Sequence, residues 1–189
     1  VTVIAEPPPL VMNAGLNDAW FYPVTNGQGF FITVFPDIGY VSLSWFTYDT
    51  ERPDVGVTAN LGEPGHRWLM ALGKYSDNQA VMDISITTGG IFDTPSETTE
   101  VNDGTMLLTF TDCENGTIEY YIPSINQKGF VPIQRVVSDN ITFCEAIAEH
   151  ATTQQHKDET SNILSLGDSA TPTEAQPLVK MNVGLNDAW

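Results

Sequence analysis

The chain has 189 residues and a mass of 20.7 kDa, and its 41% hydrophobic content excludes a fully disordered polypeptide and allows one sizeable core. No apolar run approaches the roughly 20 residues of a membrane-spanning helix, so we expect no membrane insertion. The 24 acidic residues outnumber the 7 basic ones, giving a net charge of −17. Nucleic acids and anionic lipids are bound through Lys and Arg, and we therefore expect neither as a partner.

A nine-residue sequence motif occurs twice in the chain. Residues 12–20 read Met-Asn-Ala-Gly-Leu-Asn-Asp-Ala-Trp, and residues 181–189 repeat eight of these nine positions, with only Ala14 and Val183 differing. Self-similarity at a fixed offset is typical of repeated units. We interpret residues 181–189 as the start of a second copy, and the chain, which begins at Val1 without Met or a leader, as part of a longer tandem protein. Alternatively, the tail imitates the chain's own first strand and complements a neighbouring subunit.

Composition divides the chain into parts. All 9 Phe, all 6 Tyr and three of the 4 Trp lie between positions 20 and 143, and positions 145–188 hold no aromatic residue. A polar segment of this kind cannot bury enough apolar area to offset its ordering entropy, although its Ala, Glu and Gln content is compatible with short helices. We expect an N-terminal extended segment or preceding linker (1–11), a β-domain (12–144), a polar interdomain spacer (145–180) and the start of a second copy (181–189).

Within the domain the pattern is that of β-strands. Residues 29–35 are aromatic and β-branched, and a turn at Ile38-Gly39 leads into residues 40–48, so the two runs predict a hairpin. Further strands are predicted at 67–72, 80–87, 105–111, 117–122, 129–136 and 140–143. No helical pattern of 10–15 residues separates them. We predict an all-β fold, an antiparallel meander barrel or sandwich of about eight short strands, with an extended C-terminal spacer.

Several of these runs resemble one known type of domain. Three runs are similar to a β-rich domain found singly or in tandem in secreted bacterial proteins. They are residues 15–23, 26–30 and 45–49, which carry the motifs Gly-x-x-x-x-Trp, Gly-Gln-Gly and Trp-Phe-Thr-Tyr. Residues 65–69 and 133–135 resemble later blocks of that family. The resemblance covers positions 12–144. It implies a fold, an extracellular or cell-surface location and repetition, and it implies no established chemistry.

The two cysteines, Cys113 and Cys144, are predicted to form one disulfide, because an even count in an extracellular chain favours pairing. The alternative is two reduced, buried thiols in a cytosolic domain. A zinc site is a weaker reading, since two cysteines at this spacing lack the paired partners of zinc motifs.

The many acidic loop residues raise the question of Ca²⁺, which takes hard oxygen ligands. No loop carries the regular Asp-x-Asp-x-Asp-Gly spacing, and solvated acidic surface is the default interpretation. We expect no cofactor other than a possible Ca²⁺ ion. The weak candidate ligands are Asp49, Glu51, Asp54, Asp103, Asp112 and Glu114.

The amino-acid sequence contains none of the catalytic motifs considered. His66, the domain's one histidine, is accompanied by no nucleophile or zinc motif, and we expect no enzymatic activity. Trp20, Trp45 and Trp68 are candidates for stacking on a sugar or another ligand, although in a small barrel such residues usually fill the interior.

These observations favour a structural module of an extracellular tandem-repeat or filament-forming protein, whose partners are copies of itself joined head to tail. Its terminal segments would add to an exposed sheet edge of a neighbour. The predicted assembly residues are Val1, Thr2, Val3, Ile4, Ile163, Leu164, Leu166, Leu178 and Val179. The alternative is a barrel module that binds a small ligand or a carbohydrate, which an internal cavity lined by Trp and Tyr would favour.

Overall fold

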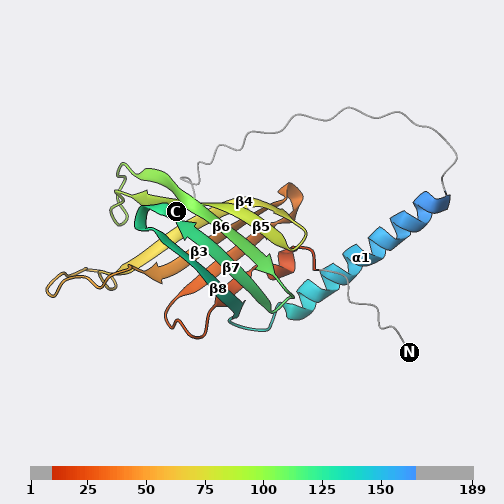
Figure 1. The fold of residues 1–189 in the computed structure, drawn as a ribbon, viewed down its shortest axis with the longest axis horizontal. Helices are drawn as coiled ribbons and strands as arrows, with labels where there is room; N and C mark the ends of the chain where they lie inside the picture. The colour runs from red at the N-terminus through yellow and green to blue at the C-terminus, as the bar shows by residue number, and fades with distance from the viewer. Residues whose placement is uncertain (1–9, 165–189) are drawn as a thin grey trace. The chain divides into compact units, whose positions relative to one another are not determined.

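The computed structural model describes residues 10–164, with side chains described for residues 10–151 and for Thr153. The chain divides into two units, Val1–Gln154 and Gln155–Trp189, and the barrel belongs to the first. Eight antiparallel strands follow one another in chain order around the closed barrel, and β1 pairs with β8 to close it (Figure 1). The strands are β1 Asp18–Phe21, β2 Gly29–Phe35, β3 Tyr40–Tyr48, β4 His66–Ser76, β5 Gln79–Thr88, β6 Thr99–Phe110, β7 Asn115–Ile122 and β8 Gln127–Arg135.

The prediction of an all-β antiparallel fold is confirmed, and a barrel is formed rather than a sandwich. The alternation of residues in the sequence explains why these segments form strands with one buried face. In β2 the side chains of Phe30, Ile32 and Val34 are buried, and the residues between them face outward. The predicted bounds of β2 and β3 match the structure.

The strand predicted at 140–143 is wrong. Helix α1 begins at Ile141 and runs to Leu164, so part of the predicted spacer is helical (Figure 1). The β-branched and aromatic text of residues 141–143 suggests a strand, but Asn140 is of a type that favours the start of a helix. Its carbonyl accepts the backbone N–H of Cys144, as in a first helical turn. Among the described residues, no helix is both long and apolar enough to cross a membrane.

The barrel has two unlike ends. The disulfide end carries the turns between β2 and β3, β4 and β5, and β6 and β7, together with the short 3-10 helix η1, Ala14–Leu16. The opposite end carries the loops at 22–28, 49–65, 89–98 and 123–126, the last of which contains the 3-10 helix η3, Pro123–Ile125. Core residues near the disulfide end, such as Leu16 and Phe110, are fully buried. Toward the opposite end, Leu69 and Tyr120 are only partly buried.

Candidate assembly site

The first copy of the repeated sequence forms a distinct part of the barrel, which we name the first-strand segment (residues 12–20). It enters at the disulfide end, where the backbone N–H of Met12 donates to the carbonyl of Asp77 at 2.7 Å. Asn13 then caps η1, because its side-chain oxygen accepts the N–H of Gly15 at 2.9 Å. Met12 and Asn13 are both buried. The segment is therefore held in place before its strand begins.

The middle of the segment lies against the start of α1. A Cβ atom added to Gly15 would lie 2.4 Å from Cα and 2.6 Å from the backbone nitrogen of Cys144, so only glycine fits there. Leu16 beside it is fully buried. Its carbonyl accepts the indole N–H of Trp20 at 3.2 Å.

Strand β1 itself forms only a short ladder. It has four residues, of which three pair with β2 and two pair with β8. Side chains supply the rest of its attachment. The Asn17 side chain accepts the backbone N–H of Val34 at 2.6 Å, and Trp20 is fully buried with its ring 4.9 Å from that of Phe110. Specific side chains, more than backbone pairing, therefore hold this strand.

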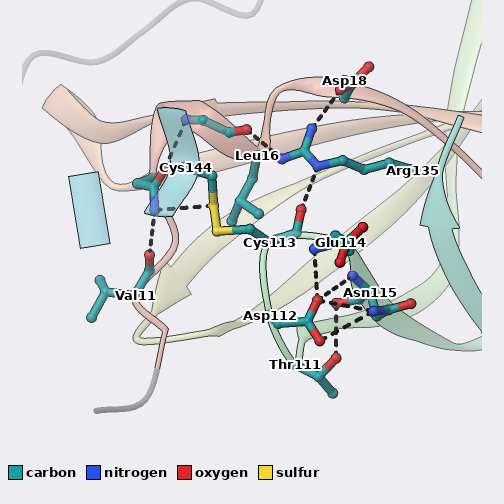
Figure 2. Close-up of a disulfide and its surroundings, with 12 residues drawn as sticks. Val11, Leu16, Asp18, Thr111, Asp112, Cys113, Glu114, Asn115, Arg135 and Cys144 are labelled. Carbon is teal, nitrogen blue, oxygen red and sulfur yellow. Dashed lines mark hydrogen bonds and ion pairs between the residues drawn. A yellow bond between two sulfur atoms is a disulfide. The ribbon is translucent and has the colours of Figure 1, made fainter. Parts of the chain in front are cut away.

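Arg135, at the end of β8, joins the segment to the rest of the barrel (Figure 2). Its guanidinium donates to the carboxylate of Asp18 at 2.6 Å and to the carbonyls of Gly15 and Cys113. The same group lies 4.7 Å from the ring centre of Trp20. Side chains of the ion pair are 3% exposed for Arg135 and 11% for Asp18, so both charges are nearly buried. A buried charge is tolerated only when paired and hydrogen-bonded, and here both conditions are met.

The predicted disulfide is confirmed. Cys113 and Cys144 are joined, with Cα atoms 5.9 Å apart and a separation of 31 positions in sequence (Figure 2). The bond ties the turn after β6 to the first turn of α1. Within that turn, Asp112 accepts the backbone N–H groups of Glu114 and Asn115, each at 2.7 Å.

The two copies of the nine-residue sequence are identical at the positions whose side chains or backbone make the contacts described here. Met12, Asn13, Gly15, Leu16, Asn17, Asp18 and Trp20 each meet a requirement described above, and all seven recur in residues 181–189. Ala19 recurs as well, and its carbonyl accepts the N–H of Val136 at 3.0 Å. Ala14, the position that differs, is half-buried. The repeat therefore preserves the residues through which the first-strand segment makes these contacts, whereas Phe21, the last residue of β1, lies outside the repeated nine.

Sequence reasoning missed the role of Arg135. The available signal was a basic residue closing an otherwise apolar and uncharged run, Phe130–Gln134, in a chain with only seven basic residues. A shallow surface depression of about 420 Å³ lies beside Arg135 and is also lined by Glu114 and Gln134. All three nitrogens of the Arg135 guanidinium donate to the partners named above, so the depression presents no free cation to an anion.

The three candidate ligand-stacking tryptophans lie on opposite sides of the barrel wall. Trp20 and Trp45 face the interior, where the Trp45 indole N–H is buried and has no hydrogen-bond partner within the described part of the chain. Trp68 lies on the outer surface with half its area exposed, paired across the strands with Phe46. The ring of Phe46 in turn meets that of Phe31 edge-on at 5.7 Å. The structure thus does not bring the three together.

The candidate calcium ligands lie apart from one another in several loops. Asp49 forms an exposed ion pair with Arg67 at 2.7 Å, and Asp103 accepts the backbone N–H and the hydroxyl of Ser124. Asp112 orders its own turn, as described, and the remaining candidates, Glu51, Asp54 and Glu114, are exposed. Among the side chains that the structure describes, those of residues 10–151 and Thr153, no group of three acidic, His or Cys residues is placed to hold a metal ion. The calcium interpretation stays a prediction.

His66 and Tyr75 are titratable groups outside the first-strand segment. His66 is exposed, with its ring 5.6 Å from that of Tyr48 and its Nδ1 accepting the backbone N–H of Glu63. Burial raises the pKa of the Tyr75 hydroxyl above its usual value. Neither group is accompanied by a nucleophile within hydrogen-bonding distance among the contacts described.

The predicted assembly residues fall mostly beyond the described part of the chain. Ile163 and Leu164 belong to α1, but their side chains lie outside the described set. The others also lie outside the described residues: Val1, Thr2, Val3, Ile4, Leu166, Leu178 and Val179.

Comparisons of the chain with protein-family models, with curated proteins and with solved structures found no match.

Proposed function

We propose that the protein is a structural module of an extracellular tandem-repeat or filament-forming protein, linked head to tail to copies of itself through its terminal segments. One observation carries this proposal. Eight of the nine residues of the first-strand segment recur at the far end of the chain, and they include the residues whose side chains hold this segment in the barrel. A chain that carries both a closed barrel and a second closing segment has the means to join one barrel to the next.

The disulfide supports the proposed location, and the charge sets a condition on assembly. Disulfides persist in oxidising compartments, which fits an extracellular or cell-surface protein. The net charge of −17 keeps separate modules soluble, because they repel one another at low ionic strength. The resemblance to a domain found singly or in tandem in secreted bacterial proteins, stated from the sequence, is compatible with this location and with repetition.

The test is the oligomeric state of the full chain across concentration and salt, measured by analytical ultracentrifugation and by negative-stain microscopy. We expect oligomers that lengthen with concentration, because a head-to-tail contact does not close on itself. The control is the chain ending at residue 180, which keeps the barrel, α1 and the spacer and is expected to stay monomeric. Monomers of the full chain under all conditions would contradict the proposal.

A second candidate function is a module that binds a small ligand or a carbohydrate. The buried Trp45 indole N–H favours it, because this donor has no described acceptor and a ligand hydroxyl entering from the opposite end could supply one. The apolar cluster inside the barrel opposes it, since Phe30, Trp45 and Tyr120 already pack on one another. Titration with mono- and oligosaccharides, followed by tryptophan fluorescence, tests it against a Trp45→Phe variant. This binding would survive truncation at residue 180.

A further inference from the structure

We infer that residues 181–189 of one chain occupy the position of the first-strand segment in the barrel of another copy, displacing that copy's own residues 12–20. The inference rests on the proposed head-to-tail function and specifies its contact. The ligand of the site is thus a second copy of this chain. The site is the slot between β2 and β8, together with the start of α1.

The slot selects side chains that the tail possesses. Arg135 needs a carboxylate, which Asp18 supplies and Asp187 repeats. Cys144 leaves room only for glycine, which Gly15 supplies and Gly184 repeats. The space beside Phe110 takes an indole, which Trp20 supplies and Trp189 repeats.

The remaining positions fit in the same way. The buried site of Leu16 is matched by Leu185, and the Asn17 amide that accepts the Val34 N–H is matched by Asn186. Val183 replaces Ala14, a half-buried position at the start of η1. The tail can therefore reproduce the described contacts of residues 12–20.

Strand β1 also forms the shortest backbone ladder of this barrel. It has the fewest residues of the eight, and its ladder to β8 consists of two residue pairs. The exchange therefore breaks few backbone hydrogen bonds while the other seven strands stay paired. A linker of positions 165–180 separates the end of α1 from the tail, and 16 residues span up to about 55 Å when extended.

The balance between the two occupants follows from their near identity. The chain's own segment is tethered to β2 by a short loop, so it competes at an effective concentration in the millimolar range or above. With equal contacts, we expect roughly a tenth or less of the slots to hold a foreign tail at about 0.1 mM protein. A covalent trap makes this fraction measurable, and weakening the resident segment increases it.

The trap uses a cross-strand pair on the outer surface. Ala19 lies directly opposite Phe31 in the β1–β2 ladder, and Phe31 is 58% exposed. Facing residues of antiparallel strands have Cα atoms about 4.5–5.5 Å apart, which suits a disulfide. In the full chain carrying Phe31→Cys and Ala188→Cys, a tail in a foreign slot forms an interchain bond. The matched control, Phe31→Cys with Ala19→Cys, forms the same bond within one chain.

Oxidation followed by non-reducing electrophoresis and peptide mass spectrometry gives the readout. We expect a ladder of covalent oligomers joined through positions 31 and 188 in the test chain and a monomer in the control. Leu185→Asp in the test chain should reduce the ladder at least tenfold, because the matching site is fully buried. Val183→Ala should leave it at least as strong. A bond between positions 31 and 188 within one chain, or no such bond, overturns the inference.

A second variant changes the competition without the trap. Trp20→Ala weakens the resident segment, and we expect the full chain carrying it to shift into oligomers at least tenfold more than the unchanged chain. Trp20→Ala with Trp189→Ala should lose that shift, because the tail no longer offers the better fit. Equal association of both variants contradicts the inference. Oligomers that form without the bond between positions 31 and 188 refute the exchange yet leave the head-to-tail function standing, whereas monomers throughout refute both.

Discussion

Replacing Gly15 with alanine tests how closely the first-strand segment lies against α1. The added Cβ would stand 2.4 Å from Cα of Cys144, whereas ordinary contacts of a Cβ lie between 3.4 and 4 Å. The two backbones must therefore separate by about 1 Å, and no change of rotamer relieves the clash. The disulfide and α1 both hold Cys144, so we place the cost at the upper end of overpacking, about 3 kcal/mol.

This cost should appear as a fall in the melting temperature of about 10 °C for a domain of this size. The assay is thermal unfolding followed by circular dichroism, with calorimetry to check that the transition is two-state. Gly90→Ala is the matched control, because a Cβ there meets only the Thr98 methyl at 3.9 Å and should change the melting temperature little. A Gly15→Ala melting point within about 2 °C of the unchanged chain would refute the close approach on which the argument depends.

Three further predictions concern the same end of the barrel and its charge. Removing the disulfide with Cys113→Ala and Cys144→Ala should lower the free energy of unfolding by about 3–4 kcal/mol, measured in urea, because a loop of 31 residues is no longer closed in the unfolded chain. Asp18→Asn should lower the free energy of unfolding by about 3–5 kcal/mol in the same assay, because it leaves Arg135 buried without its counter-charge. The exposed ion pair of Asp49 with Arg67 gives the control, and Asp49→Asn should lower the free energy of unfolding by less than about 1 kcal/mol. Raising NaCl to about 0.5 M should strengthen association in sedimentation experiments, because each chain carries a net charge of −17; association that weakens with salt would contradict this.

Much of the barrel was predictable because its strands follow a simple physical rule. Alternation of inward apolar and outward residues marks β2 and β3 to the residue, and the hairpin turn between them has Gly39 at a positive φ of 67°. The disulfide was predictable from its count and spacing. The predicted count of about eight strands matches the barrel, but the runs behind that count include the wrong strand at 140–143 and leave out β1. Barrel closure depends on β1 meeting β8, a contact between distant parts of the chain that turn residues do not reveal.

The errors have physical causes of the same kind. Residues 141–143 look like a strand locally, and the helix forms because Asn140 and the residues after Cys144 favour it. Trp68 looks like a core residue, but the register of β4 against β3 turns it outward beside Phe46. Arg135 went unnoticed because its partners, Asp18 and two backbone carbonyls, lie more than twenty residues away in sequence.

Residues 181–189 are recognisable as a repeat from the sequence, but the role of each repeated position is visible only in the structure of the first copy. From the text alone, residues 181–189 indicate a second copy or an imitation of the first strand, and both interpretations use the same nine letters. The structure gives these letters separate tasks: Gly15 allows the approach to α1, Asp18 neutralises Arg135, and Trp20 fills the core. A sequence that merely continued a strand would need only apolar alternation. The tail preserves the buried charge partner and the obligatory glycine as well, so its sequence meets the requirements that this slot places on an occupant.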